Sequence, residues 1–252
     1  MTFIFDEKTE TCDDFLGGKL RFIQPMNGYR AGVEPVLLAA ALPINIKGRV
    51  LDMGCGVGTA GLCALWHNPN LHMVGIEANH LATEHAKRNA ILNNMGERAE
   101  IYEQILGDED FVDPLKSDEV DAVITNPPWF EKAHSQRAEG SRGAGRQEGE
   151  ISLDIWLDYC IRKLRTGGLI AIIHRSHRMG DILQIFKGRI GNIKIIPIYS
   201  KQYQPAKHVI ILGNKARKTP LELRAGFIMH DAKGNFLAEA KDIFMKGRRL
   251  SF

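Results

Sequence analysis

Apolar runs of strand length alternate with helical patterns through the middle of the chain. Strands are predicted at 50–53, 71–77, from 100 onward, 120–125 and 169–173. Helices are predicted at 59–66, 80–93 and 151–164, the second of them capped by Asn79. This alternation predicts right-handed crossovers and a mostly parallel sheet with helices on both faces. Two later runs, 193–199 and 208–212, bring the expected α/β fold to seven strands.

The N-terminal part of the chain has its own pattern. Residues 19–24 alternate between polar and apolar types like a strand, and the Ala/Leu-rich stretch 32–42 predicts a buried helix. We expect both to form a preamble, residues 1–48, that packs on a main domain of residues 49–252.

Two segments farther along the chain predict irregular or short elements. Residues 227–230 and 235–244 flank Lys233-Gly234, which predicts a C-terminal hairpin. Residues 131–150 contain no large apolar residue, and this composition predicts a long mobile loop.

Composition narrows the class of protein. A chain of 252 residues with 44% hydrophobic and 25% charged residues fits one soluble globular domain with a small elaboration. The apolar run 36–42 stops at Pro43 and is too short to span a bilayer, and the first residues lack the pattern of a signal peptide. We therefore expect a cytoplasmic protein. The cysteines lack the paired spacing of metal sites, so we expect reduced thiols and no metal at Cys12, Cys55, Cys63 and Cys160.

The formal net charge of +3 hides a strong asymmetry along the sequence. Residues 97–121 hold ten acidic residues against two basic ones, and residues 162–218 hold thirteen Lys and Arg residues with Asp181 as the one acid. The basic segment either attracts a polyanion or forms solvated helix faces and strand edges. If it tracks a phosphate backbone, Arg175, Arg178 and Lys201 are candidate substrate-binding residues.

A glycine-rich turn joins the first predicted strand to the first helix. Asp52 precedes Gly54, Gly56 and Gly58, and alternate glycines let a backbone turn sharply close to a ligand. Glu77 ends the second strand nineteen residues after Gly58, where a carboxylate can accept hydrogen bonds from both ribose hydroxyls.

Three interpretations of this turn differ in what they explain. The spacing Gly56-x-Gly58-x-x-Gly61 satisfies the dinucleotide pattern, which alone is a weak signal. A structural strand-to-helix turn needs neither the acid nor so many glycines. The full segment more closely resembles the S-adenosylmethionine (SAM) motif of class I methyltransferases, and that resemblance implies that Asp52 helps to hold the cationic methionine end of SAM.

The segment Asn126-Pro127-Pro128-Trp129 follows the fourth predicted strand. Two prolines explain a stiff loop, but they do not explain the flanking Asn and aromatic residue. The segment resembles the (Asn/Asp)-Pro-Pro-aromatic motif of amino methyltransferases. In such a site the Asn126 side-chain oxygen and the Pro127 carbonyl would each accept an N–H of the amine, and Trp129 would stack on the target ring.

Further segments extend the resemblance along most of the chain. Gln24-Pro25-x-x-Gly28-Tyr29-Arg30, Arg146-Gln147-Glu148 and Leu164-Arg165-Thr166-Gly167-Gly168 resemble elements of the bacterial tRNA adenine-N6 methyltransferases that act next to the anticodon of a valine tRNA. This family implies a class I methyltransferase fold, SAM as cofactor, and tRNA as partner. Asp108 is its candidate adenine-binding acid only if the alignment slips by several residues.

The resemblance and the charge pattern together give a set of expected site residues. The catalytic ones are Asn126, Pro127 and Trp129. The cofactor-binding ones are Arg30, Asp52, Gly54, Gly56, Gly58, Glu77 and Asn126. The substrate-binding ones are Pro128, Arg146, Arg175, Arg178 and Lys201.

Other functions stay open on the sequence alone. Amino methylation of a glutamine in a translation factor, of guanine N2 in ribosomal RNA, or of a small molecule would use the same motif. A nucleotide-binding oxidoreductase or a non-catalytic RNA-binding module would not need Asn126. The basic segment favours nucleic acid over a small molecule.

Overall fold

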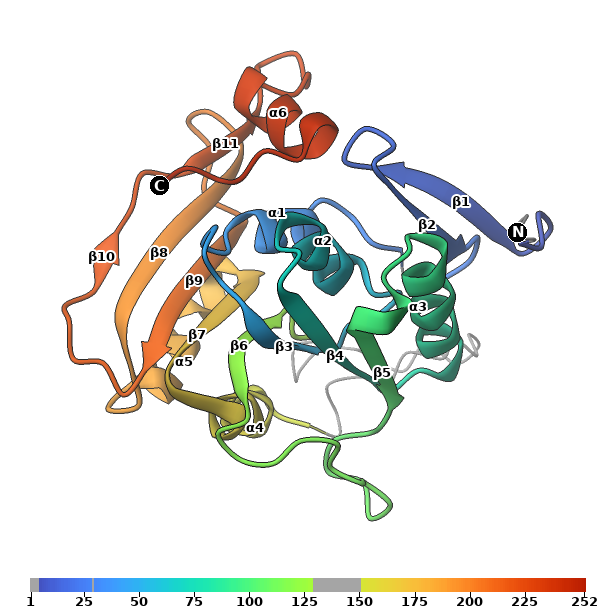
Figure 1. The fold of residues 1–252 in the computed structure, drawn as a ribbon. Helices are drawn as coiled ribbons and strands as arrows, with labels where there is room; N and C mark the ends of the chain where they lie inside the picture. Colours follow the sequence, from blue (N-terminus) through green and yellow to red (C-terminus); the bar gives the residue numbers. More distant parts are fainter. Residues whose placement is uncertain (1–4, 29, 129–150) are drawn as a thin grey trace, which may run out of the picture.

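The central sheet of this computed structural model, which describes residues 5–28, 30–128 and 151–252, has the order β10-β8-β9-β7-β6-β3-β4-β5 (Figure 1). Strands β3 to β7 are parallel, and β9 lies antiparallel between β7 and β8. The seven predicted strands are β3 (Gly48–Met53), β4 (Leu71–Glu77), β5 (Ala99–Glu103), β6 (Val120–Thr125), β7 (Leu164–Arg175), β8 (Ile190–Lys201) and β9 (His208–Lys215). Two short strands, β10 (Glu222–Leu223) and β11 (Phe227–His230), extend the sheet by pairing with β8.

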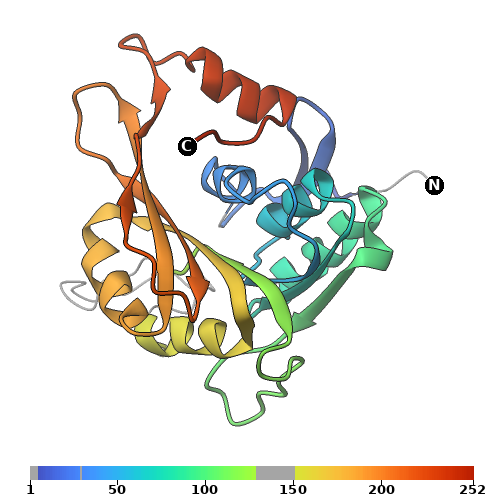
Figure 2. The same cartoon turned by 60° about the vertical axis from the view of Figure 1, so that its left-hand side comes forward.

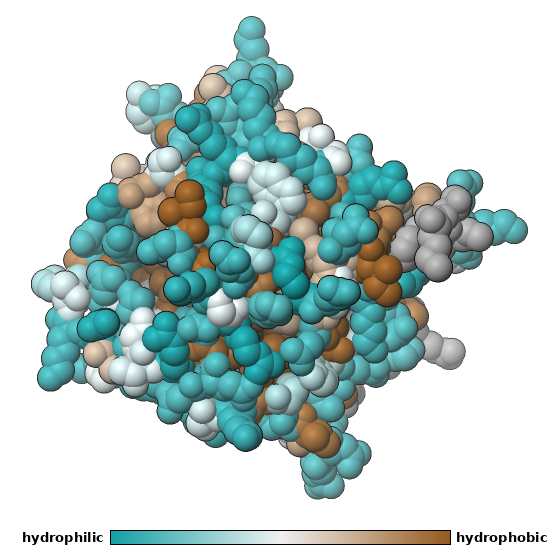
Figure 3. Space-filling view, viewed as in Figure 1, coloured by the Kyte–Doolittle hydropathy of each residue, from teal (hydrophilic) through white to brown (hydrophobic). Residues whose placement is uncertain are grey.

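Helices cover both faces of the sheet, as the sequence predicts (Figures 1 and 2). One apolar core joins a sheet face to α1 (Glu34–Ala40), α2 (Thr59–His67) and α3 (His80–Leu92). A second core joins the opposite face to α4 (Leu153–Lys163) and α5 (Met179–Phe186). Along each strand alternate residues enter opposite cores: Val50 enters the first core and Leu51 the second. The face seen in Figure 3 is largely hydrophilic, with apolar residues in small scattered groups.

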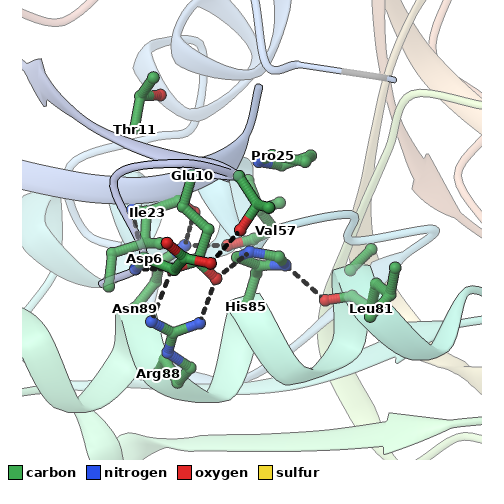
Figure 4. Close-up of polar contacts among 12 residues, drawn as sticks. Asp6, Glu10, Thr11, Ile23, Pro25, Val57, Leu81, His85, Arg88 and Asn89 are labelled. Carbon is green, nitrogen blue, oxygen red and sulfur yellow. Dashed lines mark hydrogen bonds and ion pairs between the residues drawn. The ribbon is translucent and has the colours of Figure 1, made fainter. Parts of the chain in front are cut away.

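An N-terminal hairpin lies against α3, outside the main sheet (Figure 1). Its strands are β1 (Glu10–Phe15) and β2 (Leu20–Pro25); the sequence predicts β2, and β1 is an additional finding. Arg88 of α3 donates to both carboxylate oxygens of Glu10, and His85 Nε2 lies 3.0 Å from Glu10 Oε1 (Figure 4). The Arg88 guanidinium holds the pKa of Glu10 down at about 2, so this ion pair fastens the hairpin at neutral pH.

The predicted C-terminal hairpin is wrong. Residues 227–230 form β11, but they pair in parallel with β8, and Ala238–Lys246 forms helix α6. Ala240 and Ile243 lie three positions apart on one helix face and are both buried, which fits a helical period better than a strand. Gly247, with a φ of +67°, ends the helix. Of the expected pairing, one bridge between His230 and Phe236 is present.

Candidate active site

The two motif loops lie side by side at the carboxyl edge of the sheet. Met53, the last residue of β3, pairs with Thr125, the last residue of β6, and the strands are parallel. The Thr125 hydroxyl donates to the Met53 carbonyl at 2.8 Å. Gly54 and Asn126 therefore start neighbouring loops, which is where open α/β sheets bind ligands.

The glycine loop has the left-handed backbone that its sequence predicts. The φ angles of Gly54, Gly56 and Gly58 are +72°, +55° and +86°. A Cβ on Gly54 would lie only 2.9 Å from the ring of Trp156 in α4. The Trp156 indole N–H donates to Thr125 Oγ1 at 3.0 Å, so this tryptophan lies between the glycine loop and the end of β6. Sequence reasoning places Trp156 on an amphipathic helix but gives no signal that it reaches the site.

Glu77 ends β4 next to the glycine loop. Its Oε2 accepts the Gly56 N–H at 2.8 Å, and its Oε1 accepts the Asn79 N–H at 2.8 Å. Each carboxylate oxygen keeps a second lone pair. The carboxylate can therefore hold the loop and still accept hydrogen bonds from a ribose.

Replacement of Glu77 by alanine is expected to weaken SAM binding by about 1–3 kcal/mol, because ribose hydroxyls lose a charged acceptor and the Gly56 N–H loses its partner. Calorimetry with SAM measures the change. Glu84→Ala is a matched control, since Glu84 is an exposed acid of α3 that pairs with Lys87. Equal affinities for wild type and Glu77→Ala would contradict the predicted role.

Asp52 lies beneath the glycine loop and is only 2% exposed. Its Oδ2 accepts the N–H of Gly61, in the first turn of α2, at 2.8 Å. Burial raises the pKa of Asp52 to about 7, and the nearby charge of Glu77 adds to this, while the bond from Gly61 opposes it. A buried carboxyl whose pKa is raised to near neutrality, at the carboxyl end of a parallel strand, is typical of a functional group.

The structure describes the Asn-Pro-Pro segment as far as Pro128. Asn126 is partly exposed, Pro127 is buried, and Pro128 is exposed. The predicted catalytic Trp129 and the predicted substrate-binding Arg146 lie outside the described residues. The structure thus brings Asn126 to Pro128 together with Asp52, Glu77 and the three glycines, as the sequence predicts.

Arg30 is held within the N-terminal segment. Its guanidinium donates to Asp13 Oδ2 at 2.7 Å, to Thr11 Oγ1 at 2.9 Å and to the Pro25 carbonyl at 3.1 Å. These contacts give Arg30 a part in the hairpin, and its role at the cofactor stays a prediction. Asp108 lies in the loop after β5, exposed to solvent, and its role toward adenine also stays a prediction.

The basic segment 162–218 divides into two groups of different character. At the amino edge of the sheet, away from the motif loops, three of its cations pair with the acidic segment: Lys163 with Asp113, Arg165 with Asp121 and Lys215 with Asp118. These three cations therefore serve as structural ion-pair partners within the chain.

The remaining predicted substrate residues lie at the carboxyl edge. Arg175 ends β7, Arg178 pairs with Asp181 at 2.6 Å, and Lys201 ends β8, where its Nζ donates to the Ala232 carbonyl. The structure places all three at the edge that carries the motif loops.

A hollow of about 760 Å³ opens at the amino edge, opposite the motif loops. It is lined by residues 41–47 and 249–252 and includes the Arg165–Asp121 ion pair. We assign the candidate site to the carboxyl edge, because the glycine loop and the buried Asp52 lie there.

Three other findings concern membrane spans, metal sites and cysteines. Among the residues described, no helix combines the length and apolarity needed to cross a membrane, and no group of three or more His, Cys, Asp or Glu side chains is placed to hold a metal ion. All four cysteines are free thiols, and three are buried: Cys55, Cys63 and Cys160.

Known proteins resemble the chain in sequence. Residues 34–142 match the family model of the methyltransferase small domain. A tRNA1(Val) (adenine(37)-N6)-methyltransferase of Yersinia enterocolitica is 32% identical over 155 residues, covering 61% of this chain and 60% of the relative. The protein of the same name from Aliivibrio fischeri is 29% identical, covering 65% and 63%. The aligned part of this chain thus spans less than two thirds of each curated relative.

Solved structures resemble the chain in fold. A predicted O-methyltransferase from Agrobacterium tumefaciens has a TM-score of 0.69 at 20% identity, over 87% of this chain and 98% of that one. A Thermus thermophilus 16S rRNA N2 G1207 methyltransferase, solved with SAM and guanosine, has a TM-score of 0.57 at 17% identity, over 82% of this chain and 50% of that one.

The family match, the relatives and the fold agree with the site geometry. The fold of the chain is thus that of class I methyltransferases, and residues 34–142 are similar to the methyltransferase small domain.

Proposed function

We propose that the chain uses SAM to methylate an exocyclic amino nitrogen, and that its target is N6 of an adenine in tRNA, in the cytoplasm. One observation carries the chemistry: the glycine loop with its two carboxylates lies directly beside Asn126 and Pro127 at the end of β6. The names of the sequence relatives support adenine in tRNA as the target.

The residues around the glycine loop fit SAM in charge and shape. SAM supplies an electrophilic methyl group on a sulfonium cation, and its methionine end carries an ammonium. Asp52 offers a buried carboxyl for a cationic group, and Glu77 offers lone pairs for ribose hydroxyls. The left-handed glycines let the backbone approach the ligand without an intervening Cβ.

Asn126 and Pro127 prepare the amine for attack. The lone pair of an exocyclic amine is delocalised into its ring, so the amine is a poor nucleophile. Two acceptors, the Asn126 side-chain oxygen and the Pro127 carbonyl, orient its N–H groups and direct the lone pair toward the methyl group. Positioning supplies most of the acceleration, and no strong base is needed before attack, because the cationic product loses its proton readily.

A basic surface beside the site supports RNA as the substrate. We call Arg175, Arg178, Lys201 and Lys207 the basic edge. Ser176 joins two parts of it, because its N–H donates to the Lys207 carbonyl at 3.1 Å and its hydroxyl donates to the Ala206 carbonyl at 2.5 Å. Tyr203, in the turn between β8 and β9, is 95% exposed and offers a ring on which a base can stack.

Removal of charge from the basic edge is expected to weaken RNA binding and to make its salt dependence shallower, because fewer counterions are released. Lys207→Ala should lower the slope of log K against log salt by about 1, without changing base preference. Filter binding or fluorescence anisotropy across a salt series measures it.

Lys47→Ala is the matched control, since Lys47 lines the hollow at the opposite edge. Its salt slope should equal that of wild type. An RNA affinity that stays flat between low and high salt, or equal slopes for both variants and wild type, would show that the basic edge is only a solvated surface.

Labelled SAM tests the proposed function against its alternatives. The protein is incubated with total RNA, total protein and metabolites, and the label is followed into each fraction. We expect label in RNA. Label in a translation factor or in a metabolite would replace tRNA as the substrate, and binding of NAD without SAM would end the methyltransferase hypothesis.

A further inference from the structure

The side-chain amide of Asn89 joins three elements of the fold. Asn89 lies on α3 and is fully buried. Its Oδ1 accepts the Ile23 N–H at 2.7 Å, and its Nδ2 donates to the Ile23 carbonyl and the Val57 carbonyl, each at 3.0 Å (Figure 4). Ile23 belongs to β2 of the N-terminal hairpin, and Val57 belongs to the glycine loop.

A second asparagine, one helical turn later, provides the comparison. Asn93 Oδ1 accepts the Arg21 N–H at 2.9 Å, and Asn93 Nδ2 donates to the Arg21 carbonyl at 2.7 Å. Asn89 and Asn93 thus bond the backbone N–H and carbonyl groups of Ile23 and Arg21, which lie on the edge of β2 that faces away from β1. A neighbouring strand would form similar bonds with alternate residues. Asn89 donates the bond to the glycine loop, while the third bond of Asn93 goes to the Asn89 carbonyl.

The contact with Val57 lies next to the contact that Glu77 makes with the same loop. Glu77 fixes the N–H of Gly56, and Asn89 fixes the carbonyl of Val57, the next residue. The two side chains come from different elements, β4 and α3, so they hold the middle of the loop from two directions. These three bonds hold the buried Asn89 amide in one orientation. Because one of them goes to the Val57 carbonyl, the amide also fixes the position of the glycine loop.

We propose that Asn89 is a positioning residue that makes the N-terminal hairpin a working part of the cofactor site. The ligand's identity rests on the proposed function. Docking of the hairpin fixes Asn89, Asn89 fixes the Val57 carbonyl, and a fixed loop binds SAM more tightly. Because coupling between two sites is reciprocal, bound SAM must in turn stabilise the docked hairpin.

The test compares Asn89→Ala with Asn93→Ala. Both variants lose the bonds to β2, so both should lower the melting temperature. Asn89→Ala alone also frees the Val57 carbonyl, and we expect it to weaken SAM binding about tenfold in calorimetry, the scale of one buried hydrogen bond. In Asn93→Ala the hairpin stays docked through Asn89 and the Glu10–Arg88 ion pair, so this variant should bind SAM within about twofold of wild type.

Hydrogen exchange supplies a readout that needs no variant. In the wild-type protein SAM should slow amide exchange in residues 20–25, and Asn89→Ala should lose this protection while Asn93→Ala keeps it. Equal SAM affinity for wild type and Asn89→Ala overturns the inference. Equal weakening in both variants also overturns it, as does a wild-type hairpin that SAM leaves unprotected.

The failure of the proposed function looks different. A wild-type chain that is folded but does not bind SAM refutes the cofactor assignment and this inference together. A wild-type chain that binds SAM, with a hairpin that does not respond, refutes the inference alone. If Asn89→Ala does not fold, the SAM affinity of Asn89→Ser and the exchange experiment on the wild-type protein test the inference instead.

Discussion

Replacement of Asn126 by alanine is expected to lower turnover by about 10²-fold or more and to leave SAM affinity nearly unchanged. Loss of one well-placed polar group in an active site commonly has an effect of this size. Asn126 follows β6 next to the glycine loop, and we assign its side-chain oxygen to the amine of the substrate rather than to the cofactor. Its loss therefore affects the transition state more than the binding of SAM.

Three measurements on the same preparations test this prediction: melting temperature, SAM affinity and the rate of methyl transfer. Asn45→Ala is the control, since Asn45 is exposed at the amino edge of the sheet. If Asn126 only stiffens its loop, SAM affinity and stability should fall together with turnover. A folded, SAM-binding Asn126→Ala variant with wild-type turnover would contradict the mechanism.

Replacement of Asp52 by asparagine is expected to weaken SAM binding by about tenfold to a hundredfold, the range for a lost hydrogen bond to a charged group. Asparagine keeps an acceptor for the Gly61 N–H but removes the charge that would attract the ammonium of SAM. Burial raises the pKa of Asp52 from 3.8 to about 7. A carboxyl with a raised pKa makes the folded state less stable as pH rises from about 4 to about 7, so at neutral or higher pH the variant should be at least as stable as wild type.

The same ionisation predicts a pH profile for binding. An ammonium favours the charged carboxylate, so wild-type SAM affinity should rise with pH up to about 7 and then level off. Asp52→Asn should lack this rise. Calorimetry in buffers of different ionisation enthalpy measures the proton released on binding below pH 7. A wild-type affinity that is flat with pH, or an unchanged affinity in the variant, would remove Asp52 from the cofactor site.

The sequence predicts the core of the site well because the signals are local. A strand, a glycine turn and a helix follow one another from Gly48 to His67, and parallel pairing then brings Asn126 beside Gly54 without further information. The left-handed glycines are likewise visible in the sequence, since other residue types rarely adopt that conformation.

The features that the sequence does not predict depend on distant contacts. Trp156 reaches Gly54 only because the first turn of α4 lies near the carboxyl edge, and Asn89 acts through partners on β2 and in the glycine loop. The charge of the basic segment is divided by ion pairs with residues about fifty to a hundred positions away, such as Lys163–Asp113 and Lys215–Asp118. No pattern within the segment shows which cations these pairs will use.

The most direct test of the central claim is analysis of the nucleosides formed by the purified protein. Unmodified tRNA is incubated with SAM that carries a labelled methyl group, then digested to nucleosides that are separated and identified by mass spectrometry. The account predicts labelled N6-methyladenosine, formed by wild type and nearly absent with Asn126→Ala. Labelled N2-methylguanosine, or no labelled nucleoside from a protein that binds SAM, would contradict it.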